Sequence, residues 1–147
     1  MKESVPMRVL TAIVVALLLA APAMARPAAA PYSEGFVQQL ANLINSYRQQ
    51  QGLEPLALAD ELAALASEHS VSMSAQQQLS HQGFDGRFRG ARSRVCVENV
   101  AWNHRTPEGM LEGWLRSPGH HRNLVDPAVS RMGLAFSTRY VTFFACR

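Results

Sequence analysis

Hydrophobic residues recur at helical spacing near the start of the folded region, with polar residues between them. The apolar positions are Phe36, Leu40, Leu43, Ile44 and Tyr47. Residues three and four apart lie on one face of a helix, so this pattern predicts an amphipathic helix. Ser33 is its candidate N-cap, and Gly52 stands where a helix commonly ends.

A second apolar face predicts a helix from about Asp60 to about Gln78. Its apolar side consists of Leu62, Leu65, Ala66, His69 and Met73. His69 lies among these residues, and we interpret it as a half-buried core histidine. Residues 80–94 follow as a predicted loop, because three glycines interrupt them.

The second half of the chain predicts further helices and most of the strands. Residues 95–101 have the β-branched content of a strand, and Thr106–Pro107 and Ser117–Pro118 each have the pattern of a helix start. The second of these starts places His120 near the beginning of a short helix. Residues 131–137 and 140–146 predict a hairpin that turns near Thr138 and Arg139. The fold class expected from these elements is an α+β sandwich with one small sheet.

The first residues are typical of an export signal. Lys2 and Arg8 precede an apolar stretch over 9–21, and Ala23-Met24-Ala25 has the small residues of a cleavage site. The apolar stretch is short for a membrane span, which needs about 20 residues, although an uncleaved anchor is the alternative. We predict a signal peptide over 1–25, a linker over 26–35 and one domain over 36–147. We expect a secreted or periplasmic monomer without a membrane anchor after cleavage.

Charge and cysteine content narrow the classes of partner and compartment. The formal charge is +3 for the full sequence, and removal of Lys2, Glu3 and Arg8 lowers it to +2. Such a mild charge argues against a nucleic-acid partner. The sequence has 2 cysteines, Cys96 and Cys146. In an exported chain they predict a disulfide worth roughly 4 kcal/mol, with two buried thiols as the alternative.

Three segments carry candidate chemistry: SHQGF with His81, VENV with Glu98, and GHHRN with His120. In this order they resemble the CAP superfamily of cysteine-rich secretory proteins, antigen 5 and plant pathogenesis-related proteins, in its short bacterial secreted branch. The resemblance covers roughly residues 36–147. It implies a three-layer α-β-α sandwich with a central open cleft that holds two histidines and two glutamates.

Three of the four cleft positions transfer to this sequence as His81, Glu98 and His120. Val97 stands where the family has a glycine before this glutamate. The fourth position, three residues after Trp114, holds Ser117 instead of a glutamate. Glu112 is the nearest acid and the remaining candidate, but a two-residue offset places it about 200° around the helix from Trp114.

These residue types permit several kinds of chemistry. Zinc could bind His81 and His120 and keep a position for water, with Glu98 as general base. Such a site would make the protein a hydrolase of envelope material such as peptidoglycan, with all three residues as catalytic candidates. The first hypothesis is instead a cleft that binds an extracellular or envelope-derived ligand, lipid included, either through zinc held by His81 and His120 or without a metal. In a third alternative, the tetrad is a structural network and the loops form an interaction module.

Other features have simpler interpretations. The arginines at 87, 89, 92 and 94 could contact anionic polymers or lipid headgroups, but a solvated loop with an ion pair between Arg87 and Asp85 is the simpler expectation. Trp102 and Trp114 are expected in the core. Cys96 and Glu98 would share one face of their strand because side chains alternate with a period of two. We therefore expect the disulfide to make the strand that presents Glu98 more rigid.

Overall fold

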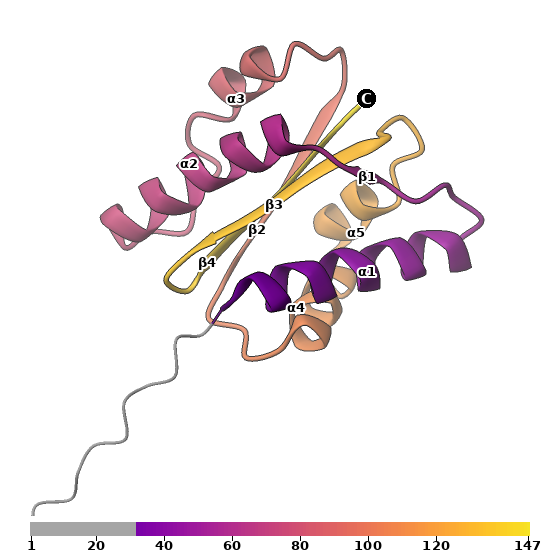
Figure 1. Ribbon diagram of the computed structural model, residues 1–147, viewed down its shortest axis with the longest axis horizontal. Helices are drawn as coiled ribbons and strands as arrows, with labels where there is room; N and C mark the ends of the chain where they lie inside the picture. The colour runs from indigo at the N-terminus through magenta and orange to yellow at the C-terminus, as the bar shows by residue number, and fades with distance from the viewer. Residues whose placement is uncertain (1–31) are drawn as a thin grey trace, which may run out of the picture.

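The computed structural model describes residues 32–147, so the predicted signal peptide and most of the predicted linker lie outside the described residues. Two helical layers enclose one sheet in this part of the chain (Figure 1). The elements in chain order are α1 (Glu34–Gln50), β1 (Ala57–Leu58), α2 (Asp60–Gln76), α3 (Phe84–Gly90), β2 (Cys96–Trp102), α4 (Pro107–Leu115), α5 (Pro118–Leu124), β3 (Arg131–Ser137) and β4 (Tyr140–Cys146). The predicted α+β sandwich is confirmed.

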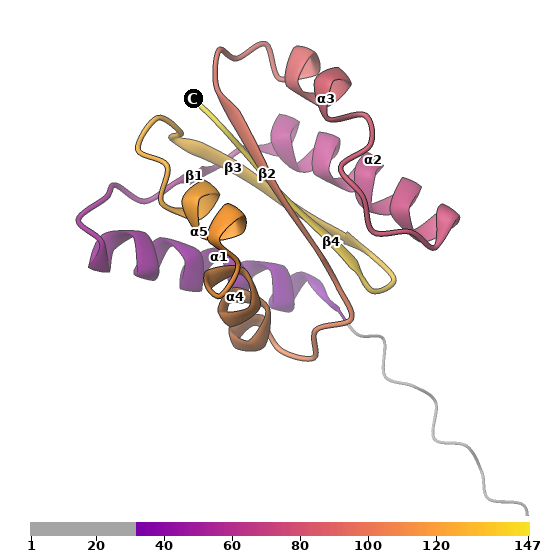
Figure 2. The same cartoon turned by 180° about the vertical axis from the view of Figure 1, so that it is seen from behind.

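The sheet of the described chain has the order β1-β3-β4-β2, so β2 is an edge strand. Strand β4 is buried along its whole length and pairs antiparallel with both β2 and β3. Helices α2 and α3 lie on one face, and α1, α4 and α5 lie on the other (Figure 2). The predicted hairpin is confirmed, with Ser137 paired to Tyr140.

Local caps explain where two of the helices begin. The Ser33 hydroxyl accepts a hydrogen bond from the Phe36 amide at 3.3 Å, and the Thr106 hydroxyl accepts one from the Gly109 amide at 3.0 Å. Each satisfies an amide that has no partner within its helix. Both helix starts were predicted from these residue types.

The largest part of the core lies between the sheet and the layer that contains α1, α4 and α5. Trp114, Met110, Leu40 and Phe143 are almost fully buried there. A second cluster, which includes Leu62, Ala66 and Phe144, lies under α2. Among the described helices, none combines the length and apolar character that a membrane crossing needs.

The structure corrects two local expectations. Residues 84–90 form α3, although three glycines in 80–94 predicted only a loop. Glycine lowers helix propensity by about 1 kcal/mol, and tertiary contacts of Arg87 and Phe84 override that preference here. Trp102 is 50% exposed instead of buried, and it is the last residue of β2.

Candidate functional site

Glu98 is the centre of the candidate site. It projects from β2, and its side chain is only 1% exposed. Oε2 accepts a hydrogen bond from Nε of Arg87 at 2.6 Å, and Oε1 accepts one from a terminal nitrogen of Arg87 at 2.8 Å. Oε1 also lies 2.9 Å from Nδ1 of His81. Both oxygens of this buried carboxylate are therefore already engaged.

Arg87 comes from α3 and also holds the loop that carries His81. One of its terminal nitrogens donates to the carbonyl oxygen of Gln82 at 2.9 Å. The expected ion pair with Asp85 is wrong, because the guanidinium turns inward to the carboxylate of Glu98. Burying a charged guanidinium costs free energy, and pairing with the buried carboxylate of Glu98 offsets that cost.

His81 is oriented by Glu98 while remaining accessible. Its side chain is 50% exposed, although Nδ1 contacts the buried carboxylate. An ionised carboxylate only accepts hydrogen bonds, so Nδ1 carries the proton in this pair. In the neutral ring, Nε2 is then the unprotonated nitrogen and can accept a proton or a hydrogen bond.

His69 forms the inner wall of the same cluster. Its Nε2 lies 2.7 Å from the carbonyl oxygen of Ser80 and 3.8 Å from Oε1 of Glu98. Burial lowers the pKa of His69 and outweighs the opposing effects of the Ser80 carbonyl and the Glu98 charge. The predicted core position of this histidine is confirmed, and its contact with Ser80 holds the residue that precedes His81.

His120 reaches the site from the opposite helical layer. Two asparagines fix α5 against β2: Asn99 donates to the carbonyl oxygen of His120 at 3.0 Å, and Asn123 donates to the carbonyl oxygen of Glu98 at 2.9 Å. The two amide side chains also bond to each other at 2.8 Å. The rings of His81 and His120 have centroids 6.4 Å apart and an angle of 46° between their planes.

The protonation states follow from these surroundings. Burial opposes ionisation of Glu98, but hydrogen bonds from His81 and Arg87 and the charge of Arg87 outweigh it and lower its pKa. Burial also lowers the pKa of His120, and the nearby His81 adds to this effect. The arrangement therefore pairs a buried carboxylate with two imidazoles near the open edge of β2.

Glu112 is not part of this cluster. Its side chain is 63% exposed and forms an ion pair with Arg116 at 2.5 Å on the surface of α4. Ser117, three residues after Trp114, is the N-cap residue of α5. Three of the four residues expected from the resemblance thus lie together, and the remaining acid does not join them.

The donor set fits a zinc site poorly. Among residues 32–147, no group of three or more histidine, cysteine or acidic side chains could hold a metal ion. Glu98 uses both oxygens in bonds to Arg87 and His81, and Nε2 of His69 is engaged with the Ser80 carbonyl oxygen, which leaves the imidazoles of His81 and His120. Zinc sites in proteins usually have three or four protein ligands, and the guanidinium beside Glu98 adds a repulsive charge.

A hollow of about 300 Å³ adjoins the cluster on the α2 side. Its lining includes His69, Gln82 and Arg87, so it shares two residues with the Glu98 network. Sequence reasoning missed Arg87, Asn99 and Asn123 as residues that build the site. A signal was available for two of them: Asn99 is polar within a strand otherwise rich in apolar residues, and Asn123 ends the GHHRN segment.

Comparison with known proteins places the chain among bacterial relatives. It is 30% identical over 108 residues to YkwD of Bacillus subtilis, covering 69% of this chain and 42% of YkwD. It is 26% identical over 114 residues to the membrane protein YlbC of the same organism, covering 71% of this chain and 32% of YlbC. The chain therefore spans less than half the length of these two curated relatives.

Solved structures agree with this placement. An extracellular protein of Bacillus anthracis that contains an SCP domain superposes with a TM-score of 0.72 at 28% identity, covering 77% of this chain and 40% of that one. An outer surface protein of Borrelia burgdorferi superposes with a TM-score of 0.73 at 17% identity, covering 79% of this chain and 95% of that one. The second likeness shows the fold alone.

The profile of the cysteine-rich secretory protein family matches residues 41–147, which include the whole Glu98 network. This match spans most of the chain and agrees with the sandwich fold. The chain belongs to the cysteine-rich secretory protein family, also called the CAP family.

Proposed function

We propose that this is an exported CAP-domain protein that binds an extracellular or envelope-derived ligand at His81 and His120. The observation that carries the proposal is the orientation of His81, whose Nδ1 bonds to a fully buried carboxylate while half of its side chain is exposed. A buried acid that fixes a surface imidazole is costly to maintain for stability alone. It is useful where the imidazole must meet a ligand in one orientation.

Export is proposed on two grounds. Residues 1–25 have the charge, apolar stretch and small residues of a signal peptide. The similar Bacillus anthracis protein is described as extracellular. Secretion of the chain into the medium or periplasm, with a mature N-terminus after Ala25, is checked by N-terminal sequencing of the exported protein.

The ligand chemistry follows from the two imidazoles. The lowered pKa of His120 favours its neutral form near pH 7, so this ring can both donate and accept a hydrogen bond. The Nε2 of His81 supplies a hydrogen-bond acceptor on a neighbouring ring, whose centroid lies 6.4 Å from that of His120. This combination suits a polar ligand with hydroxyl or amide groups, such as the peptide part of peptidoglycan.

Binding is tested by NMR of the histidine side chains during titration with soluble muropeptides. We expect the signals of His81 and His120 to shift in the wild type and binding to be lost in His81→Ala. His104→Ala is the matched control, since His104 lies against Gly113 of α4, outside the cluster. Equal binding by wild type and His81→Ala would reject this site. A histidine variant whose folding stability falls while its ligand binding is retained would favour the scaffold interpretation.

The zinc prediction is tested separately by calorimetry on the disulfide-bonded protein. Because two imidazoles remain as protein donors, we expect binding weaker than micromolar affinity, which corresponds to about −8 kcal/mol. Micromolar, stoichiometric binding that disappears in both His81→Ala and His120→Ala would replace the metal-free proposal with a metal site.

Hydrolysis is the second candidate function, and the His81–Glu98 contact favours one version of it. Glu98 is a poor general base because its pKa is lowered and both oxygens are engaged. His81 would instead take a proton at Nε2, with Glu98 stabilising the resulting imidazolium. Turnover of peptidoglycan fragments that is abolished in His81→Ala and much reduced in Glu98→Gln would support it, whereas full activity in either variant would exclude it.

A further inference from the structure

The exposed end of β2 carries a feature that the His81 site does not use. Trp102 is 50% exposed, although it follows a stretch of buried strand residues. Its ring lies beside that of Tyr140, with centroids 6.4 Å apart and planes inclined by 42°. Tyr140 is buried and is the partner of Trp102 on the adjacent strand β4. The indole therefore contacts Tyr140 on one side and presents its remaining surface to solvent.

A hollow of about 670 Å³ lies beside this indole. Three parts of the chain build it: the end of α2, the turn between β3 and β4, and the end of β2. Its lining residues are Ser74, Gln77, Trp102, Thr138, Arg139 and Tyr140. The volume lies within the range of ligand pockets in proteins, about 300–1,000 Å³.

The rim of the hollow is fixed by side-chain bonds between these segments. The hydroxyls of Ser74 and Thr138 are 2.8 Å apart and join α2 to the hairpin turn. Arg139 donates to Oδ1 of Asn103 at 2.9 Å, which joins the turn to the end of β2. Thr138 has a φ of 51°, a left-handed conformation that is unusual for a β-branched residue and that these contacts help to hold.

The chemistry around the indole is mostly neutral. Ser74 and Thr138 offer hydroxyls, and Gln77 offers a primary amide that can both donate and accept. The one cationic residue in the lining, Arg139, already bonds to Asn103. An anionic polymer would require several converging cations, and a lipid tail would require an enclosed apolar cavity.

We propose that this hollow binds a neutral saccharide, whose ring stacks on Trp102 while its hydroxyls bond to Ser74, Gln77 and Thr138. A sugar ring has an apolar C–H face and a polar rim, and the hollow places an aromatic face next to neutral donors and acceptors in the same way. The site shares no side chain with the His81 cluster. It therefore does not rest on the function proposed above.

The test uses the mature protein with three neutral tetrasaccharides: chitotetraose, cellotetraose and maltotetraose. Binding is measured by calorimetry and by tryptophan fluorescence, since Trp102 is exposed and Trp114 is 2% exposed. We expect at least one sugar to bind the wild type. Trp102→Ala should weaken this binding roughly tenfold, the factor that about 1.4 kcal/mol of stacking supplies. Trp102→Phe should retain most of it.

Leu58→Ala is the matched control. Leu58 is 56% exposed on β1, at the opposite edge of the sheet, and its removal should leave saccharide affinity unchanged. His81→Ala should also bind the sugar normally, which separates this proposal from the one at the histidines. Gln77→Asn shortens the amide while tolerating the left-handed backbone at this position, φ 51°, and should weaken binding.

Three results would overturn the proposal: none of the three sugars binds the wild type, Trp102→Ala binds as well as the wild type, or Trp102 is buried by self-association. The last is measured by sedimentation, as a dimer of the wild type that becomes a monomer in Trp102→Ala. If Trp102→Ala fails to fold, Gln77→Asn decides the outcome, and unchanged affinity in this variant would contradict a saccharide site.

Discussion

Arg87 and Glu98 form a two-point ion pair that joins α3 to the edge strand β2. The distances are 2.6 Å from Nε to Oε2 and 2.8 Å from a terminal nitrogen to Oε1. The side chains are 10% and 1% exposed, respectively. The planar guanidinium matches the carboxylate in two parallel bonds, which a lysine at this position could not reproduce. Through this pair, α3 determines the position of the acid that orients His81.

Removal of Arg87 should destabilise the fold strongly. Arg87→Ala leaves a buried carboxylate without its main partner, and we expect a loss of about 3–5 kcal/mol in the free energy of unfolding. Urea unfolding followed by circular dichroism measures it. Arg89→Ala is the matched control, because Arg89 lies two residues further along the same helix and is exposed, and its loss should stay within about 0.5 kcal/mol.

The double variant Arg87→Met with Glu98→Leu separates the contribution of the ion pair to stability from that of side-chain packing. It removes both charges, so it should be more stable than Arg87→Ala alone. If Arg87→Ala unfolds at the same urea concentration as Arg89→Ala, the ion pair contributes little and the site has another source of rigidity.

Gly133 should tolerate no side chain. It lies on β3 where α2 crosses the sheet, and a Cβ atom there would collide with the backbone of Leu62 and Ala63. Backbone atoms in a helix cannot move aside without disturbing the layer, so we expect Gly133→Ala to cost at least about 1–3 kcal/mol, the usual range for overpacking.

Gly86→Ala is the matched control for that substitution. Gly86 lies in α3, and a Cβ there would meet nothing within 4 Å. The higher helix propensity of alanine should raise the free energy of unfolding by about 0.5–1 kcal/mol. Opposite signs for the two substitutions in urea unfolding would support the close approach of α2 to β3, and a neutral Gly133→Ala would contradict it.

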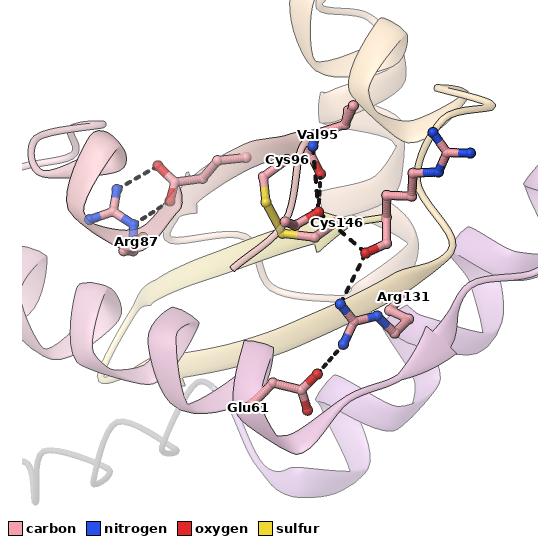
Figure 3. Close-up of a disulfide and its surroundings, with 9 residues drawn as sticks. Glu61, Arg87, Val95, Cys96, Arg131 and Cys146 are labelled. Carbon is pink, nitrogen blue, oxygen red and sulfur yellow. Dashed lines mark hydrogen bonds and ion pairs between the residues drawn. A yellow bond between two sulfur atoms is a disulfide. The ribbon is translucent and has the colours of Figure 1, made fainter. Parts of the chain in front are cut away.

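The disulfide should stabilise both the fold and the geometry at Glu98. Cys96 and Cys146 are directly paired residues of β2 and β4, bonded across a separation of 50 residues (Figure 3). Replacing both with alanine should lower the free energy of unfolding by roughly 4 kcal/mol. It should also broaden or shift the NMR signals of His81, because Glu98 follows Cys96 by two residues on the same strand face. Unchanged histidine signals would reject this coupling.

Local patterns predicted most of the elements. Ser33 and Thr106 mark helix starts by a mechanism that acts within three residues, and the hairpin turn at Thr138 separates two apolar stretches. The expected disulfide is also present. What such patterns lacked was tertiary information: α3 forms because Arg87 has a partner 11 residues away on another element.

The candidate site was only partly accessible from sequence. His81, Glu98 and His120 were selected through their segments, but nothing in the chain indicated that Glu98 would be held by Arg87 with both oxygens engaged. For the same reason, the general-base role assigned to Glu98 has less support than a role for His81. Trp102 was expected in the core because aromatic strand residues usually are. Its exposure goes with its place as the last residue of β2, which residue type alone does not reveal.

Acid should destabilise the fold in two separate pH ranges. The folded pKa of His69 lies below its ordinary value of 6.5, chiefly because burial disfavours the charged ring. The unfolded chain then binds a proton that the folded chain does not, so stability is full above about pH 6.5 and falls as pH decreases below it. His120, whose pKa is also lowered by burial, acts in the same range and direction.

Glu98 acts at lower pH. Its folded pKa lies below 4.5, because its hydrogen bonds and the Arg87 charge outweigh burial, so its contribution is present above that value and is lost as pH falls through the folded pKa. Urea unfolding between pH 7 and pH 3.5 measures both ranges. His69→Gln keeps a donor for the Ser80 carbonyl but cannot titrate. It should flatten the curve below pH 6.5 by up to about 1.4 kcal/mol per pH unit and leave the fall below pH 4.5 intact. A His69→Gln curve parallel to that of the wild type would show that this histidine does not couple folding to pH.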